Sequence, residues 1–321
     1  MQSNGFQFHI DCVSKFHHSI YVRGWFYHKT DPLESVELIC SGVQSTISHV
    51  GTPHAAVTHL GPNLGFDIQI LCDTADFDET SRIIFRSTSG KTVRAGLLFI
   101  TRNAEQKGKY TRLLAEFKEM ATGRMLDMGG RNLSGVDRAR RFPGLDVTVL
   151  DILPGDDVDV VGDAHDLSTF FPANHFDAVY SSSVFEHLMA PWKVVMEINK
   201  VLQPGGLGLV QSHQTKGLHN APWDFWRFSD TAWKALFNER TGFEIIGTAL
   251  DRPQHIVPHY LSFGKDNAEQ VVGFEASAVL FRKIGPGDVQ WMTALQDIDW
   301  RSCAPDEPAA LVPTLTLPKR A

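Results

Sequence analysis

The stretch Met125-Leu126-Asp127-Met128-Gly129-Gly130-Arg131 decides the fold of this 321-residue chain. An apolar run ends in a carboxylate and is followed at once by two glycines, which permit a tight turn and a close approach of the backbone to a ligand. Asp151 lies 21 residues beyond Gly130, at the end of the next apolar run. A carboxylate at that spacing commonly accepts hydrogen bonds from a nucleotide ribose. The pair predicts an adenosine-binding turn; the alternative is an ordinary tight turn beside a solvated acidic residue.

The sequence around this stretch alternates between strand and helix patterns. Apolar runs typical of strands cover residues 124–128, 146–150, 158–161, 176–180, 206–211, 243–250 and 274–282. Apolar residues at helical spacing cover residues 110–121, 190–202 and 231–238. This alternation predicts an α/β fold with a doubly wound, mainly parallel sheet.

The N-terminal part has a different pattern. Short β-rich runs cover residues 6–12, 19–27, 35–40, 66–71, 81–87 and 92–100, and no helix is predicted among them. This spacing predicts a small, all-β, sandwich-like accessory domain. The predicted organisation is therefore an accessory domain over 1–100, a polar linker over 101–109, the α/β domain over 110–285, and a proline-punctuated, partly disordered tail over 286–321.

Composition restricts the class of partner. The net charge of −7 disfavours binding to nucleic acid through its phosphates. No apolar run reaches the ~18–20 residues that span a bilayer, and residues 1–5 lack the pattern of a secretory leader. The four cysteines are far apart and show no metal-binding spacing, so we expect buried free thiols. Together these features predict a cytoplasmic protein without a membrane span.

The turn after Asp127 departs from the dinucleotide fingerprint. Arg131 follows Gly130, and the next glycine is Gly135, so the pattern G-x-G-x-x-G is absent. A pyrophosphate needs that fuller cradle at the helix N-terminus. The sequence therefore favours an adenosine ligand without phosphates over NAD.

Residues 127–243 resemble the class I S-adenosylmethionine-dependent methyltransferase family, in particular a type 11-like subgroup associated with glycans and polysaccharides. Four further landmarks occur in the family's order: Val161-Gly162-Asp163-Ala164, Phe176-Asp177-Ala178-Val179-Tyr180-Ser181, Ser183-Val184-Phe185-Glu186-His187-Leu188 and Val201-Leu202-Gln203-Pro204-Gly205-Gly206. The resemblance implies a seven-stranded Rossmann-like domain with an antiparallel final hairpin. It also implies S-adenosyl-L-methionine as the cofactor.

The resemblance further implies which residues contact that cofactor. They are Asp127, Gly129 and Gly130 at the methionine part, Asp151 at the ribose hydroxyls, Ile152, Asp163 and Ala164 at the adenine, and Ser181 at the strand end that borders the methyl group. Arg131 replaces the family's second motif glycine. Either the loop has a different shape, or the guanidinium lies over the site.

Methyl transfer to an alcohol needs an aligned acceptor and a base that takes its proton. His187 follows the fourth strand of the α/β domain, and imidazole titrates near neutral pH, so His187 is the first candidate and His213 the second. The alternative for His187 is a histidine that only packs or caps. Some relatives hold a divalent metal with the pattern E-x-x-E-H, but Ser183 occupies the first acidic position here. We therefore predict no metal.

An aromatic-rich segment, residues 219–228, follows the fifth strand and resembles a segment of methyltransferases that act on glycans. Aromatic faces pack on sugar rings while charged groups direct hydrogen bonds. The residues assigned to acceptor binding are Glu186, His219, Asp224, Trp226 and Arg227. In the alternative, the aromatics anchor the loop and Asp224 pairs with Arg227.

The predicted function is methyl transfer from S-adenosylmethionine to a hydroxyl of a small acceptor, a sugar or glycan precursor in polysaccharide biosynthesis. A homo-oligomer formed through the N-terminal domain is possible. One alternative is a non-catalytic binding or assembly module that retains the methyltransferase fold. Another alternative is a methyltransferase that acts on nucleic acid or protein. The net charge of −7 disfavours a nucleic-acid acceptor.

Overall fold

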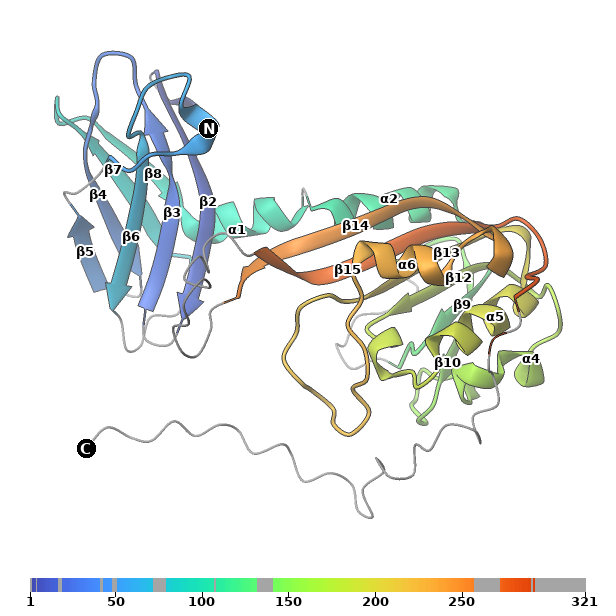
Figure 1. The fold of residues 1–321 in the computed structure, drawn as a ribbon. Coiled ribbons are helices and arrows are strands. Elements are labelled where there is room, and N and C mark those ends of the chain that lie inside the picture. The colour runs from blue at the N-terminus through green and yellow to red at the C-terminus, as the bar shows by residue number, and fades with distance from the viewer. Residues whose placement is uncertain are drawn as a thin grey trace, which may run out of the picture. The chain divides into compact units, whose positions relative to one another are not determined.

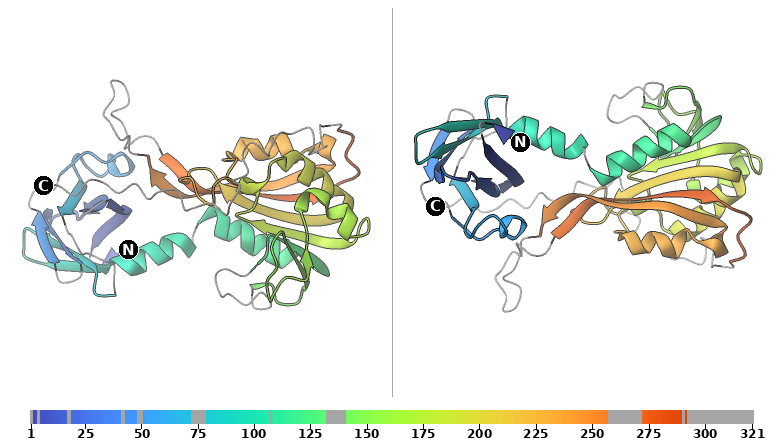
Figure 2. Two further views of the ribbon diagram at one scale, coloured as in Figure 1. Left: turned by 90° about the horizontal axis from the view of Figure 1, so that it is seen from below. Right: turned by 90° about the horizontal axis from the view of Figure 1, so that it is seen from above.

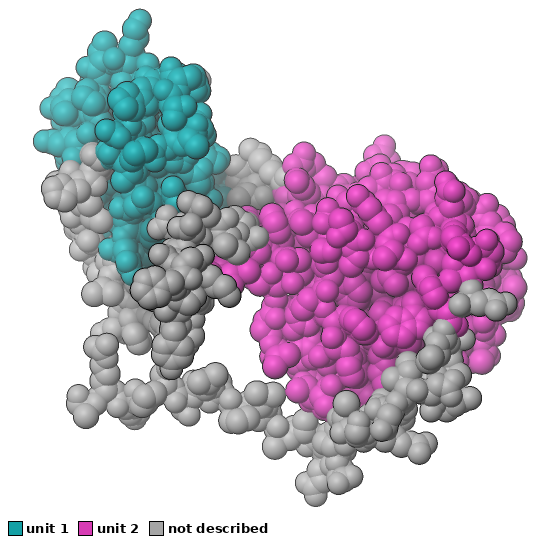
Figure 3. Space-filling model, in the orientation of Figure 1, with its two compact units in different colours: residues 1–107 teal, residues 108–321 magenta. Residues whose placement is uncertain are grey.

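The computed structural model describes residues 2–3, 5–16, 19–40, 43–47, 51–71, 79–106, 108–131, 141–256, 272–289 and 291. The chain divides into two compact units, residues 1–107 and residues 108–321 (Figure 1, Figure 3). Most of the predicted tail and of the arginine-rich segment after Arg131 lie outside the described residues. Within the described part of the chain, none of the helices is long and apolar enough to cross a membrane.

The N-terminal unit consists of two four-stranded antiparallel sheets. The strand order of the first sheet is β1 (Gln2–Ser3), β2 (Phe6–Phe16), β3 (Ser19–Tyr27), β6 (Gly65–Leu71). The strand order of the second sheet is β5 (Val43–Ile47), β4 (Leu33–Cys40), β7 (Arg82–Ser87), β8 (Thr92–Gly96). Phe85 of the second sheet packs against Phe8, Phe26 and Phe66 of the first, with ring centroids 5.0, 5.2 and 5.4 Å apart. The two sheets thus enclose one core, which confirms the predicted sandwich.

The end of this unit differs from the prediction. The last predicted strand stops at Gly96, and helix α1 (Leu97–Gln106) occupies the rest of that run and most of the predicted linker. Leu97 and Ile100 both pack against the sandwich core, and their spacing of three is helical. The prediction of no helix in this part was wrong because the four consecutive apolar residues 97–100 fit the repeat of a strand as well as that of a helix.

A buried carboxylate stabilises the sandwich. Asp31 accepts hydrogen bonds from the Ser89 hydroxyl at 2.6 Å, the Ser89 amide at 3.0 Å and the Ser87 hydroxyl at 3.0 Å. The bond from the Ser89 hydroxyl is the largest of the effects that lower the pKa of Asp31 from 3.8 to about 2. A carboxyl group with a lowered pKa stabilises the fold above its unfolded-state pKa, and this contribution is lost as the pH falls toward the folded value.

We therefore expect Asp31→Asn to lower the melting temperature of the N-terminal unit by several degrees at pH 7. The difference from the unsubstituted protein should shrink as the pH falls from about 4 toward 2, because protonation removes the same charge from Asp31. Circular dichroism melts across this range measure both effects. A difference that does not depend on pH would show that the ionised carboxylate is not the stabilising group.

The C-terminal unit contains a seven-stranded sheet. Its strand order is β11 (Val160–Val161), β10 (Asp146–Asp151), β9 (Arg124–Met128), β12 (Phe176–Ser182), β13 (Leu202–His213), β15 (Val272–Lys283) and β14 (Phe243–His255). The first five strands are parallel, and β15 is antiparallel to both of its neighbours. The predicted doubly wound sheet with an antiparallel final hairpin is confirmed.

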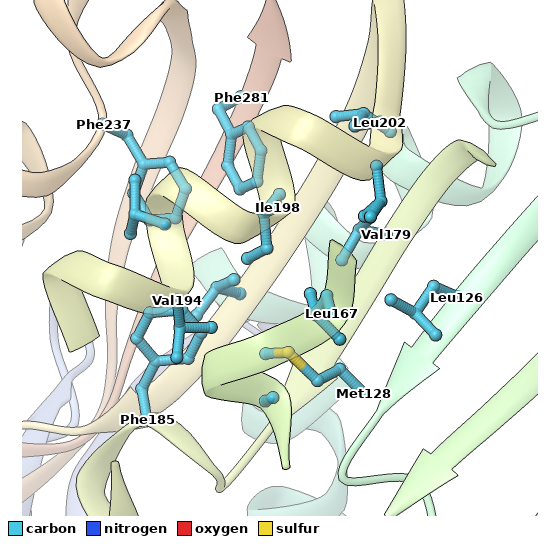
Figure 4. Packing of buried hydrophobic residues seen from close by; sticks show 14 of the residues in the cluster. Leu126, Met128, Leu167, Val179, Phe185, Val194, Ile198, Leu202, Phe237 and Phe281 are labelled. Atoms are coloured by element: carbon cyan, nitrogen blue, oxygen red, sulfur yellow. The ribbon is translucent and has the colours of Figure 1, made fainter. Parts of the chain in front are cut away.

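Helices cover both faces of this sheet (Figure 2). Among the described residues, the helices not yet named are α2 (Lys109–Met120), α4 (Leu167–Phe170), α5 (Pro191–Val201) and α6 (Asp230–Leu236). The 3₁₀ helices are η1 (Ala55–Val57), η2 (Ala164–Asp166), η3 (Phe185–His187) and η4 (Glu239–Thr241). Successive side chains of β9 alternate between two cores: Met125 belongs to the core that contains Leu113 and Phe117 of α2, whereas Leu126 belongs to the core that contains Val194 and Ile198 of α5 (Figure 4). Burial on both faces explains why these strands are apolar runs.

Candidate functional site

The ends of four strands form one edge of the C-terminal sheet. Because β9, β10, β11 and β12 are parallel, Asp127, Asp151, Asp163 and Ser181 follow or end their strands on the same side. The chain moves outward from β9 to β10 and β11 and then returns to place β12 on the other side of β9. Such a reversal opens a crevice at the carboxyl edge, where doubly wound folds bind ligands.

The turn after β9 requires glycine. Gly129 has φ +73°, and a Cβ there would lie 2.1 Å from Cγ2 of Val184. The amides of Gly129 and Gly130 donate to the Leu150 carbonyl at 2.8 and 3.3 Å, which fixes the turn against β10. The backbone therefore passes close to the strand edge with no side chain at Gly129, as the sequence predicts for a ligand-binding turn.

Asp151 is held in place by the backbone. Its Oδ2 accepts from the Arg131 amide at 3.2 Å, and its Oδ1 accepts from the Leu153 amide at 2.9 Å. Each carboxylate oxygen has a second lone pair, so the group can still accept from two ligand hydroxyls. The neighbouring Ile152 is 66% exposed and offers an apolar surface for a flat ring. This arrangement fits a ribose with its attached adenine.

Arg131 lies beside this carboxylate. Its Nε is 3.7 Å from Oδ1 of Asp151, and its aliphatic stem packs so closely on Gly155 that a Cβ there would be 3.0 Å from Cγ. Of the two alternatives that the sequence leaves open, the structure has the guanidinium at the predicted ribose site. A ligand hydroxyl bound to Asp151 would therefore lie beside this guanidinium.

We expect Arg131→Ala to strengthen binding of S-adenosylmethionine a few-fold, because partly exposed ion pairs contribute about 0.2–1 kcal/mol. Isothermal titration calorimetry measures the change, and Arg131→Lys, which keeps the charge, is the matched control. Weaker binding by the alanine variant would mean that Arg131 contacts the cofactor instead of competing with it.

Asp163 and Ser181 complete the strand-end residues. Asp163 accepts from the amide and from Nδ1 of His165, at 2.9 and 2.6 Å. Burial alone would raise the pKa of Asp163, but these bonds hold it below its ordinary value. Ala164 is buried behind it. Ser181 is fully buried, and its hydroxyl makes no hydrogen bond within the described residues, so it fits a group supplied by a bound ligand.

Glu186 lies at the centre of a second cluster, next to the end of β12. Its side chain is fully buried in η3, and Oε2 accepts from the Ser212 hydroxyl at 2.6 Å. Oε1 lies 3.2 Å from Nε2 of His213, 3.8 Å from Nε2 of His187 and 3.8 Å from Nε2 of His219. Burial alone would raise the pKa of Glu186, but its contacts with His213 and Ser212 hold it below its ordinary value.

The loop after β13 covers this cluster. Asp224, whose side chain is 2% exposed, accepts from Nη1 and Nη2 of Arg227 at 2.6 and 2.8 Å, and from the His219 amide at 2.9 Å. The hydrogen bonds from Arg227 are the main reason why the pKa of Asp224 is lowered to about 2. Trp226 donates to the Leu188 carbonyl at 2.8 Å and stays partly exposed. Asp224 and Arg227 thus brace the loop, which is the alternative that the sequence leaves open.

The structure gathers the predicted residues into two groups, the strand-end residues and the cluster around Glu186. The sequence did not identify Ser212, the hydrogen-bond donor to Glu186. A usable signal was present, because Gln211, Ser212 and His213 are three consecutive polar residues at the end of an otherwise apolar strand. Their contact with η3 depends on the pairing of β12 with β13.

The chain is similar to a sequence family and to several solved structures. Residues 107–210 match a family model described as a methyltransferase domain. No curated protein matches. Solved structures similar to the chain include a SAM-dependent methyltransferase from Archaeoglobus fulgidus (15% identity, 58% of this chain and 99% of that chain, TM-score 0.41). Another is a Burkholderia thailandensis 1,6-didemethyltoxoflavin-N1-methyltransferase with bound S-adenosylhomocysteine (16% identity, 65% of this chain and 99% of that chain, TM-score 0.40). The strand-end residues fit the S-adenosylmethionine that the sequence predicts as the cofactor.

Proposed function

We propose that the chain, whose residues 107–210 match the model of a methyltransferase domain, is a class I S-adenosylmethionine-dependent methyltransferase that methylates a hydroxyl group of a small acceptor, a sugar or glycan precursor. Bound S-adenosylmethionine supplies an electrophilic methyl group, so the protein has to hold the acceptor in line and remove its proton. The observation that carries the proposal is the cluster of one buried glutamate and three histidines next to the end of β12.

His187 is the base that we propose. Its Nδ1 is hydrogen-bonded to the Trp223 carbonyl, which can only accept. In the neutral ring the hydrogen is therefore on Nδ1, and Nε2 has the lone pair that can take a hydroxyl proton. Its side chain is 23% exposed, so an acceptor can reach it. His213 is more deeply buried and faces Glu186 and the Glu275 carbonyl, so it ranks second.

Aromatic rings beside the cluster support a sugar-like acceptor. Trp223 and Trp226 are both partly exposed, and their ring faces can pack on the apolar face of a sugar while His219 and Glu186 meet its hydroxyls. Asp224 and Arg227 would act on the acceptor by holding this loop. A homo-oligomer through the N-terminal unit and a cytoplasmic location are parts of the same proposal.

The test is a screen of intact sugars and nucleotide sugars with S-adenosylmethionine, read by mass spectrometry for one added methyl group. A methylated sugar hydroxyl supports the proposal, and methylation only of nitrogen acceptors would contradict it. The alternative of a non-catalytic module is favoured by Arg131, which lies at the ribose carboxylate. Calorimetric titration with S-adenosylmethionine decides this point, because a module without a working cofactor site gives no heat.

A further inference from the structure

Two histidines of the cluster are oriented in the same way. Nδ1 of His187 faces the Trp223 carbonyl, and Nδ1 of His219 faces the Gly217 carbonyl at 3.1 Å. Since carbonyl oxygens only accept, the hydrogen of each neutral ring is on Nδ1. Each Nε2 therefore has an available lone pair, and each lies 3.8 Å from Oε1 of Glu186.

This oxygen and the two nitrogens are three acceptors with no donor among them. Oε1 is buried, and its nearest polar neighbour outside this set is Nε2 of His213, 3.2 Å away. Glu186, His187 and His219 each offer one ligand atom, and these three atoms lie within 4.8 Å of one another. Ligands about 2.1 Å from a zinc ion in tetrahedral geometry lie about 3.4 Å apart, so a small inward movement would place all three on one ion. A cation at their centre would remove the mutual repulsion of their lone pairs.

The surroundings match those of metal-binding histidines. Such histidines usually donate their second nitrogen to a carbonyl or a carboxylate, which fixes the tautomer and the ring orientation. His219 has both partners, because Oδ2 of the buried Asp224 lies 3.4 Å from its Nδ1. This gives the Asp224–Arg227 pair a purpose beyond bracing the loop.

We propose that Glu186, His187 and His219 bind a divalent transition-metal ion of the zinc class. One carboxylate and two imidazoles are ligands that suit this class, and three protein ligands leave one position of a tetrahedral site open. His213, 3.2 Å from Oε1, positions the carboxylate from its other side. With the ion bound, the Nε2 lone pair of His187 would coordinate it instead of acting as the base, and the open position would take the acceptor hydroxyl and ease the loss of its proton; this role rests on the proposed function, whereas the ion site does not.

The proposal replaces our sequence-based prediction of no metal. That prediction tested the local pattern E-x-x-E-H, in which Ser183 is not a ligand. The third ligand comes from His219 in the loop after β13, 33 residues beyond Glu186 and outside this five-residue pattern.

The experiment is a titration of the chelator-treated full-length chain with ZnCl₂ alone, without cofactor or acceptor, by calorimetry. Absorption of the Co²⁺-loaded protein provides a second readout. We expect one ion per chain with micromolar or tighter affinity. Glu186→Gln and His219→Ala should each weaken binding at least about tenfold and alter the Co²⁺ spectrum. His175→Ala, at the opposite edge of the sheet, is the matched control and should bind as before.

Two results would overturn the proposal: no Zn²⁺ binding by the unsubstituted chain, or unchanged binding by both variants. His219 lies in a surface loop and is partly exposed, so its variant remains informative if Glu186→Gln fails to fold. Because the titration contains no cofactor, failure to bind the ion would leave the proposal of methyl transfer standing. Failure of the acceptor screen would likewise leave the ion site standing.

Discussion

Replacing Asp151 with alanine is expected to weaken binding of S-adenosylmethionine at least about 100-fold. Hydrogen bonds to a charged group contribute about 1.5–3 kcal/mol each, and the ribose offers two hydroxyls to this carboxylate. The substitution also removes the acceptor of the Arg131 and Leu153 amides, at 3.2 and 2.9 Å, so the turn loses two of its anchors. Calorimetric titration with S-adenosylmethionine and S-adenosylhomocysteine measures the loss.

Two further variants separate the causes. Asp151→Asn keeps an acceptor for the backbone amides but loses the charge, so we expect intermediate affinity. Asp156→Ala removes an equal charge from an exposed position of the same loop and should change the affinity less than twofold. Unchanged affinity in Asp151→Ala would remove the ribose assignment.

The strand-end site could be predicted because each of its parts is local. The apolar run predicts the strand from Arg124 to Met128, and the glycines after it predict the turn that ends the strand. Parallel strands then bring Asp127, Asp151 and Ser181 to one edge without any knowledge of side-chain packing. Local chemistry and topology therefore point to the same site.

The cluster around Glu186 could be predicted only as separate residues. Glu186 and His187 were identified from a motif, His213 from the end of the fifth strand, and His219 from the loop after it. Their convergence depends on backbone bonds between distant segments, such as those from the Phe225 and Trp226 amides to the Glu186 carbonyl, at 2.8 and 3.2 Å. The direction of each imidazole depends on single carbonyl groups. A single sequence does not encode such contacts as a pattern.

Replacing His187 with alanine is expected to lower kcat about 100-fold or more, with the affinity for S-adenosylmethionine unchanged. A positioned base commonly contributes a factor of 10²–10⁴, and this histidine lies in the cluster around Glu186, apart from the strand-end residues that hold the cofactor. If an ion occupies the cluster, the same variant loses a ligand, and a similar fall in rate follows. Methyl transfer to the acceptor found in the screen measures kcat, and calorimetry measures the cofactor affinity.

The remaining alternative is that His187 only braces the loop through its bond to the Trp223 carbonyl. His187→Asn tests this, because the asparagine amide can replace the Nδ1 hydrogen but supplies nothing at the position of Nε2. We expect the asparagine variant to be as slow as the alanine variant and His175→Ala to keep full rate. Recovery of the rate with asparagine would assign His187 a bracing role and leave His213 as the candidate base, since its Nε2 lies closest of the three to Glu186.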